Sequence, residues 1–285
     1  MKAFVIPNLN KRSGLSCTRD VCAELSRCGI TPCMEDCAQN EFADVCSYFA
    51  PFDHLIQECD VVITVGGDGT LLHAAKMAAF NSKPIIGVNV GRLGFMTMLE
   101  PAELSLLNQL ALGTYQTETR MMLKITKVSN DGTIQQYHAL NDAVISKGAS
   151  SNIIDLKLYC NDILVSSYRA DGIILSTPTG STAYSMSAGG PVISPCIESI
   201  VMTPICPHSL LSRTMLFAPD DVIKVSGCYD NGHFNADMNI DGEIVVPIQP
   251  GDVVTVQRSD ITAEFIRLDD KSFFSVFNKK ILLRS

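Results

Sequence analysis

The sequence has no long apolar run, no excess of basic residues and no cysteine pair at zinc-ligand spacing. No stretch approaches the roughly 20 apolar residues needed to cross a bilayer, and the first residues, MKAFVIPNLNKRSG, do not read as a signal peptide. These absences predict a cytoplasmic protein that does not span a membrane. The net charge of −8 and the pI near 5.1 argue against nucleic acid or an anionic membrane as a partner. A phosphorylated small molecule stays possible, since a few local donors suffice to bind one.

Cysteine is not scarce, but its pattern fits neither a metal cluster nor a disulfide framework. There are 11 cysteines, an odd number, and no C-x-x-C pair occurs. His138, His208 and His233 have no zinc-ligand spacing either. We therefore expect free thiols that pack as small hydrophobes or lie at the surface, in a reducing compartment.

The first third of the chain alternates β-rich runs with helix-like segments. The expected strands are 3–7, 30–34, 61–65 and 84–90, and the expected helices are 15–29, 70–80 and 101–113. Strand–helix–strand units at this spacing predict a Rossmann-like α/β domain with a parallel sheet. We place this domain at residues 1–118.

After about residue 118 the pattern changes to strand-length runs rich in β-branched residues. Asn-Asp, Asp-Gly or Gly-Asp pairs lie between these runs. An antiparallel, all-β domain is therefore predicted for residues 119–265. The remaining segment, 266–285, is apolar and basic, and we expect it to pack rather than to extend into solvent.

Residues 61–75, VVITVGGDGTLLHAA, lead from a buried strand through three glycines into a helix. Such a turn can direct backbone N–H groups and the helix start at an anion, so Gly66, Gly67 and Thr70 are candidate phosphate ligands. The pattern is neither G-x-G-x-x-G nor a P-loop. Asp68 could cap the helix. A carboxylate beside phosphates, however, usually holds a metal or accepts a proton from an attacking hydroxyl, and both roles indicate phosphoryl transfer.

A second segment, 171–191, is unusually rich in hydroxyl groups. Eight of the twelve residues from Ser176 to Ser187 carry one. Hydroxyls suit the ribose, phosphate and base edges of a nucleotide, and Tyr184 offers a face for stacking. The alternative is a Ser/Thr-rich loop that leads into a helix.

Two shorter segments add polar candidates. Asn141 and Asp142 lie in a strand-like stretch where both residue types are depleted, and an Asp can accept hydrogen bonds from a ribose diol. An edge-strand pair is the alternative. After the strand 84–90, Arg92 could reach phosphates and Phe95 could form a pocket wall; singly, each fits a solvated charge and a core aromatic.

Together and in this order, these segments resemble the NAD kinase family. The motifs that carry the resemblance are GGDGT (66–70), GRLGF (91–95), Asn141-Asp142, the segment from Asp171-Gly172 through STPTGSTAY (176–184), GGP (189–191) and IDGE (240–243). The resemblance implies an α/β N-terminal domain, a C-terminal β-sandwich, NAD bound between them, and a chain end that returns to the first domain. It also implies that ATP phosphorylates the 2′-hydroxyl of the adenosine ribose of NAD, with Mg²⁺ or another divalent cation present.

The resemblance assigns roles to individual residues. Asp68 would be the catalytic base, and no residue is assigned to the metal. The residues implied in NAD binding are Gly69, Phe95, Asn141, Asp142, Asp171, Thr179, Thr182, Ala183, Tyr184 and Ser187, with Asp171 supplied by a neighbouring subunit of a homodimer or homotetramer. Arg92 is a phosphate candidate on its charge alone, because that position varies in the family. The family usually has Asn-Glu where this chain has Asn141-Asp142, which moves the acceptor back by about one methylene.

Two other functions share part of these features. A lipid or sugar kinase would share only the glycine turn, and the hydroxyl-rich segment would then have no purpose. A non-catalytic dinucleotide sensor would bind NAD without turnover. The sequence does not distinguish ATP from polyphosphate as donor, or NAD from NADH as acceptor.

Overall fold

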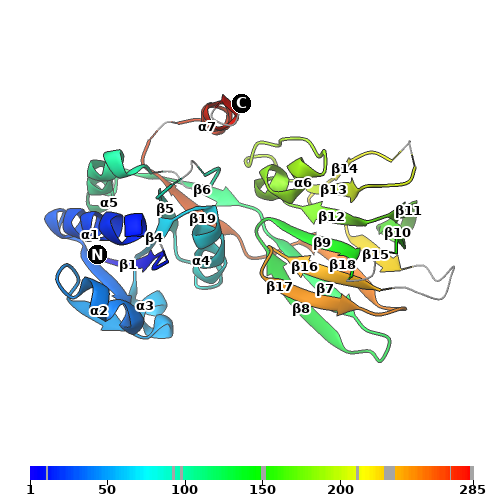
Figure 1. Ribbon diagram of the computed structural model, residues 1–285, viewed down its shortest axis with the longest axis horizontal. Coiled ribbons are helices and arrows are strands. Elements are labelled where there is room, and N and C mark those ends of the chain that lie inside the picture. Colours follow the sequence, from blue (N-terminus) through cyan, green and yellow to red (C-terminus); the bar gives the residue numbers. More distant parts are fainter. Residues whose placement is uncertain are drawn as a thin grey trace. The chain divides into compact units, whose positions relative to one another are not determined.

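The computed structural model describes residues 1–10, 12–91, 94–96, 99–148, 152–209, 212–227, 235–269 and 271–282. The chain divides into two compact units (Figure 1). The first unit consists of Met1–Arg120 together with Ala263–Ser285, and the second unit is Met121–Thr262.

The first unit is built on a seven-stranded sheet with the strand order β3-β2-β1-β4-β5-β19-β6. Its strands are β1 (Lys2–Pro7), β2 (Thr31–Glu35), β3 (Tyr48–Ala50), β4 (Val61–Gly66), β5 (Ile85–Asn89), β6 (Gln116–Arg120) and β19 (Ala263–Arg267). All neighbours pair in parallel except β6, which pairs antiparallel with β19. The predicted parallel α/β fold is confirmed. The strand β19 was not expected in this sheet.

The first unit also contains eight helical segments in the described ranges, and several of them pack on the faces of this sheet. They are α1 (Arg12–Arg27), η1 (Asp36–Ala38), α2 (Gln39–Phe42), α3 (Phe52–Glu58), α4 (Asp68–Phe80), η2 (Pro101–Leu107), α5 (Asn108–Leu112) and α7 (Phe273–Leu282). Every residue of β4 and β5 is buried, as a continuous apolar run predicts for strands covered on both faces. The core on one face joins Ile63 and Val65 of β4 to Val21 and Leu25 of α1.

One predicted helix differs in type. Within the predicted helix 101–113, residues 101–107 form a 3₁₀ segment and residues 108–112 a short α-helix, instead of one continuous α-helix. Both expected end signals are present: Pro101 begins the segment, and Gly113 follows it in the left-handed conformation with φ of 66°. Terminal signals locate such a segment, but they do not decide which hydrogen-bond period fills it.

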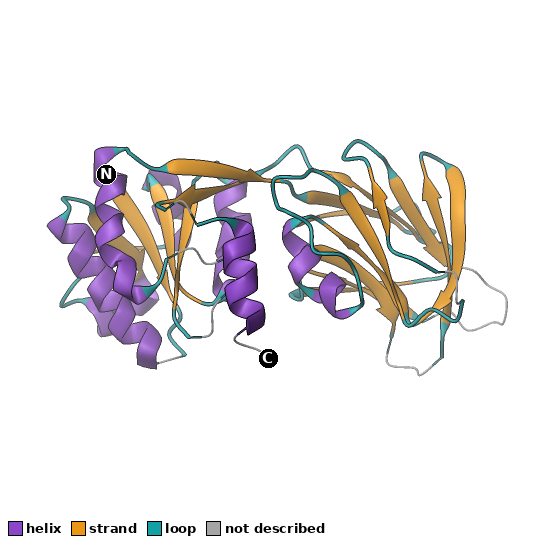
Figure 2. Cartoon of the chain, turned by 90° about the horizontal axis from the view of Figure 1, so that it is seen from above, coloured by secondary structure: helices purple, strands orange, loops and turns teal. Residues whose placement is uncertain are grey.

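The second unit is a sandwich of two antiparallel six-stranded sheets (Figure 2). In spatial order, one sheet contains β11 (Ile163–Ala170), β10 (Ile154–Cys160), β15 (Ile223–Gly227), β18 (Val253–Arg258), β7 (Leu123–Val128) and β8 (Ile134–Ala139). The other contains β14 (Met215–Phe217), β13 (Ile200–Ile205), β12 (Gly172–Ser176), β9 (Asp142–Lys147), β16 (Ala236–Ile240) and β17 (Ile244–Ile248). The predicted all-β sandwich is confirmed.

The alternation of apolar and polar residues along the strands, and the residues in the turns between them, explain the antiparallel sheets of the second unit. Leu123 and Ile125 of β7 point into the shared core with Ala143 and Ile145 of β9. Asn161-Asp162 joins β10 to β11 with both residues at positive φ (50° and 66°), which is the geometry of a two-residue hairpin turn. The short helices η3 (Thr179–Thr182) and α6 (Tyr184–Ser187) follow β12.

The thiols are free, as expected. Ten cysteines lie in the described ranges and none of them is bonded to another. Burial raises the pKa of Cys22 and of Cys33 to about 12, so these two thiols stay protonated and pack as apolar groups. Within the described part of the chain, no helix has the length and apolar character that a membrane crossing would require.

Candidate active site

The glycine turn lies where β4 ends and α4 begins. A Cβ atom on Gly66 would lie 2.5 Å from Oγ1 of Thr70, so only glycine fits below that side chain. Cβ atoms on Gly67 or Gly69 would meet nothing within 4 Å, which leaves open space beside the first turn of the helix. Free backbone N–H groups at the start of a 13-residue helix then face a space that can accept an anion.

The strand order places this turn at a topological switch point. Connections run one way from β1 to β2 and the other way from β4 to β5, so the carboxyl ends of β1 and β4 border a crevice. Asn8, directly after β1, donates from Nδ2 to Oγ1 of Thr70 at 3.3 Å, and its N–H donates to the carbonyl of Val65 at 2.9 Å. Asn8 was not among the candidate site residues. Its position directly after the first strand is the sequence feature that could have identified it as a site residue.

Asp68 is the first residue of α4, and Gly67 occupies the capping position. The Asp68 carboxylate accepts hydrogen bonds from the backbone N–H of Phe95 at 2.8 Å and of Met96 at 3.1 Å. The side chain is 32% exposed, so the carboxylate is held in place and still open to solvent. The local capping role considered for Asp68 is therefore replaced by a contact that spans 27 residues of sequence.

A side chain from α7 also lies near the Asp68 carboxylate. Nζ of Lys280 lies 3.8 Å from Oδ2 of Asp68 and 3.4 Å from the centroid of the Phe95 ring. The Phe95 ring also stacks on Phe277, with centroids 6.0 Å apart. Neither α7 residue was a candidate, because nothing in the local sequence links residue 280 to residue 68. Arg92, a predicted phosphate ligand, lies outside the described residues.

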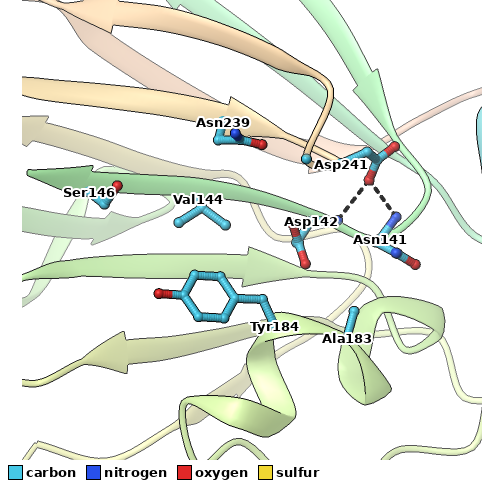
Figure 3. Close-up of a pocket in the computed structure, with 9 residues that line it drawn as sticks. Asn141, Asp142, Val144, Ser146, Ala183, Tyr184, Asn239 and Asp241 are labelled. Atoms are coloured by element: carbon cyan, nitrogen blue, oxygen red, sulfur yellow. Dashed lines mark hydrogen bonds between the residues drawn. The ribbon is translucent and has the colours of Figure 1, made fainter. Parts of the chain in front are cut away.

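The second unit contains a cavity of about 380 Å³ on the outer face of the sheet that includes β9. The cavity is lined by Asn141, Asp142, Val144, Ser146, Ala183, Tyr184, Asn239, Asp241 and Gly242 (Figure 3). Asp142, Val144 and Ser146 lie in a row along β9, with side chains opposite to those that enter the sandwich core. The structure thus brings together four residues that the sequence analysis selected: Asn141, Asp142, Ala183 and Tyr184.

Asp241 holds the start of β9 in position. Its carboxylate accepts hydrogen bonds from the backbone N–H groups of Leu140 (3.0 Å), Asn141 (2.8 Å) and Asp142 (3.1 Å), two of which are drawn in Figure 3. Its own N–H donates to the carbonyl of Asp142 at 3.0 Å. The motif 240–243 contributes to the family resemblance, but no local signal assigns a role to Asp241. The contacts reach about 100 residues along the chain, beyond any local pattern.

Asp142 is an unusual carboxyl group for a surface cavity. It is 5% exposed. Burial, together with the nearby charge of Asp241, raises the pKa of Asp142 to about 7. The group therefore changes charge near neutral pH and can respond to a ligand that donates hydrogen bonds to it.

Several of the hydroxyl groups in residues 176–187 form hydrogen bonds within the protein. Thr177 donates from Oγ1 to the carbonyl of Leu140 at 2.6 Å, and Ser181 donates to the carbonyl of Pro178 at 2.6 Å. The hydroxyls of Ser185 and Thr203 are 2.8 Å apart. These bonds keep the segment folded against the cavity, a purpose that the sequence analysis did not anticipate.

Gly180 shows how closely this segment approaches β9. A Cβ atom on Gly180 would lie 2.1 Å from the carbonyl oxygen of Asn141. Thr179 and Thr182 are buried beside it, and Oγ1 of Thr182 donates to the carbonyl of Thr179 at 3.3 Å. Tyr184, by contrast, is 46% exposed, so its ring face is available to a ligand.

The selected residues of this unit that do not line the cavity are Thr179, Thr182, Asp171 and Ser187. Asp171 lies at the other end of β12 from Ser176, where its carboxylate pairs with Nζ of Lys147 at 2.8 Å. Ser187 is exposed at the end of α6. Neither residue approaches a ligand in this cavity within one chain.

No metal site is formed by protein side chains alone in the described ranges, where no group of three or more His, Cys, Asp or Glu residues is suitably placed. Asp68 is the carboxylate that the glycine turn offers. A magnesium ion bound by nucleotide phosphates requires only one or two protein carboxylates, because phosphates and water fill its other positions.

Each of the two units matches a domain of one and the same protein family. Residues 4–115 match the model of the ATP-NAD kinase N-terminal domain, and residues 140–268 match that of the ATP-NAD kinase C-terminal domain. The NAD kinase of Acetivibrio thermocellus is 39% identical over 282 residues, which cover 99% of this chain and 97% of that protein. The NAD kinase of Caldanaerobacter subterraneus subsp. tengcongensis is 38% identical over 284 residues, 99% of each chain.

Solved structures show the same fold at lower identity. A yeast NADH kinase complexed with NADH superimposes with a TM-score of 0.88 at 23% identity, covering 100% of this chain and 88% of the other. An NAD kinase from Archaeoglobus fulgidus in complex with ATP gives a TM-score of 0.74 at 24% identity, with 99% of each chain covered.

Proposed function

The chain belongs to the NAD kinase family, and we propose which of its residues carry out the family's reaction. It transfers the γ-phosphate of ATP to the 2′-hydroxyl of the adenosine ribose of NAD and so makes NADP. Because both units match this family, a lipid or sugar kinase that shares only the glycine turn is set aside. The observation that carries the residue assignment is the Asp68 carboxylate, fixed by two backbone N–H groups at a turn that can bind phosphate.

Asp68 is the general base in this proposal. The 2′-oxygen attacks the γ-phosphorus, the bond from the γ-phosphorus to the β–γ bridging oxygen breaks, and ADP leaves. The hydroxyl proton passes to the Asp68 carboxylate. A carboxylate with 32% exposure can receive it, and its bonds to Phe95 and Met96 keep an oxygen in a constant direction.

The backbone of the turn serves the phosphates. Gly66, Gly67 and Thr70 shape the open space at the start of α4, where N–H groups and the helix dipole favour anions. Gly69, the most exposed glycine of the turn, lies beside the proposed base and would contact NAD.

The cavity of the second unit is the proposed NAD site. Asn141 and Asp142 would accept and donate hydrogen bonds to a ribose and its phosphates, while Ala183 and Tyr184 would hold an aromatic base. Thr179 and Thr182 lie buried in the segment that carries Ala183 and Tyr184 and would support it. Ser187, which does not line the cavity, would contact the adenosine only of an NAD molecule bound by a neighbouring subunit. Phe95 and Asp171 keep their proposed roles in NAD binding, although neither lines this cavity.

A divalent cation, Mg²⁺ in the simplest case, would enter with ATP and offset the charge of its phosphates. In this arrangement phosphates and water would supply most ligands, and Asp68, the carboxylate of the glycine turn, could supply one. Polyphosphate as an alternative donor and NADH as an alternative acceptor are compatible with the same groups. A direct comparison of rates would rank these substrates.

We also propose a homodimer or homotetramer in the cytoplasm. Strand β11 lies at the edge of its sheet and exposes Ile163, Leu164 and Val165, which is an apolar edge suited to a second copy. Ten free thiols support a reducing compartment. If Ile163→Lys leaves the mass measured by light scattering unchanged, this edge is not the interface.

The test of the site uses purified protein with NAD, ATP and Mg²⁺. We expect Asp68→Asn to lose about 10²- to 10⁴-fold in kcat, because a positioned base contributes that much, and to keep its affinity for NAD. Glu100→Gln, a change of the same kind in the same unit, is the control. NADP formation at the normal rate by Asp68→Asn would rule out this residue as the base.

A further inference from the structure

One face of α7 is aromatic except at one position. Phe273, Phe277 and Lys280 follow the i, i+4, i+7 spacing that places side chains on one stripe of a helix. The rings of Phe273 and Phe277 stack with centroids 6.2 Å apart, and Phe277 in turn stacks on Phe95. Lys280, three residues after Phe277, brings a charged group onto the stripe that the aromatic rings occupy.

Lys280 is buried at that position. Its side chain is 10% exposed, and Nζ lies 3.4 Å from the centroid of the Phe95 ring and 3.8 Å from Oδ2 of Asp68. Removing an ammonium group from water is costly unless a negative charge or a ring face compensates it. Both are present here, and both belong to the segments that form the glycine turn and the loop after β5.

The neighbouring lysine shows the ordinary alternative. Lys279 is 59% exposed and pairs with Glu100 at 3.0 Å, as a surface charge does. The two lysines carry the same charge in the last turn of the same helix. They differ in burial and in the carboxylate that each contacts. A comparison of variants at the two positions therefore tests the contact of Lys280 with Asp68.

We propose that Lys280 is a positioning residue for phosphoryl transfer, which fixes the Asp68 carboxylate together with the N–H groups of Phe95 and Met96. Oδ2 then faces both Phe95 N–H and the ammonium group, while Oδ1 accepts from Met96 N–H. A carboxylate held on both oxygens cannot rotate, so its remaining lone pairs keep one direction toward the hydroxyl. This inference rests on the proposed role of Asp68 as the base.

The experiment compares Lys280→Met, Lys280→Arg and Lys279→Met in steady-state kinetics with NAD and ATP. We expect Lys280→Met to lower kcat by about 10- to 100-fold, because small misplacements of a catalytic group have effects of that size. The KM for NAD should stay within about twofold, since ground-state binding is not involved. Lys280→Arg should recover part of the rate by keeping the charge, and Lys279→Met should match the unaltered protein.

Three results would overturn the inference. They are a kcat of Lys280→Met equal to that of Lys279→Met, a raised KM for NAD with normal kcat, and a kcat above that of the unaltered protein. Thermal unfolding and calorimetric NAD binding verify that the variants are folded, and Lys280→Gln replaces Lys280→Met if the latter does not fold. An active Asp68→Asn variant would instead refute the proposed base. An inactive Asp68→Asn with a fully active Lys280→Met would refute only the role of the lysine.

Discussion

The buried carboxyl of Asp142 should make the stability of the ligand-free protein depend on pH. Its pKa is about 7 in the folded chain against 3.8 for the ordinary group. An acid whose pKa is raised by folding contributes stability that is fully present below the unfolded pKa. This stability is lost as the pH rises through the folded pKa. A shift of roughly 3 pKa units at 1.36 kcal/mol per unit corresponds to about 4 kcal/mol in total.

Most of this change falls between pH 5 and pH 8. Over that interval the unfolded chain is already ionised, whereas the folded group loses its proton, so about 3 kcal/mol of the stability disappears. The variant Asp142→Asn is neutral at every pH and lacks this loss. The difference in unfolding free energy, variant minus unaltered protein, should therefore be higher by about 3 kcal/mol at pH 8 than at pH 5.

Urea unfolding followed by far-ultraviolet circular dichroism at the two pH values measures this difference. Asp237→Asn, in β16 of the same sheet, is the control for the change from carboxylate to amide. If the effect of Asp142→Asn is equal at pH 5 and pH 8, Asp142 is already ionised in the folded protein at pH 5. Burial would then not raise the pKa of Asp142 as described above.

Three further predictions concern the same cavity. Asp241→Asn should lower the unfolding free energy by about 1 to 3 kcal/mol, because the N–H of Leu140 would face an amide donor in place of a carboxylate oxygen. Urea unfolding measures this loss, and an unchanged unfolding midpoint would contradict the prediction. Gly180→Ala should abolish NAD binding in calorimetry, since the added Cβ would overlap the carbonyl of Asn141, whereas Gly69→Ala, with open space at its Cβ, should remain folded. NAD should bind more tightly at pH 8 than at pH 6, because a ribose diol donates to ionised Asp142, and Asp142→Asn should remove that dependence.

The sequence predicted the elements whose signals are local. The buried strands β4 and β5 follow from continuous apolar runs, and the turn between β4 and α4 follows from its glycines. The antiparallel sandwich follows from alternation and from turn pairs such as Asn161-Asp162. Each of these signals lies within about ten residues, where periodicity and turn chemistry decide the structure.

The parts that were missed depend on contacts between distant segments. The link from Asp241 to Asn141 spans 100 residues, and no local pattern indicates it. The same holds for Lys280, whose apolar and basic surroundings predicted packing but not a partner. The hydroxyl-rich segment was recognised, yet the use of Thr177 and Ser181 as internal donors appears only once the chain is folded back on β9.

The place of β19 has a consequence for how the protein is made. This strand lies between β5 and β6, so the sheet of the first unit has a gap until residues 263–267 have left the ribosome. The second unit is continuous in sequence and can fold earlier, with a delay on the order of ten seconds while it is translated. During that time β5 and β6 expose unpaired edges, which are sites for misassembly. Synthesis therefore completes the N-terminal unit after the unit inserted within it, and the helix that brings Lys280 to Asp68 follows later still.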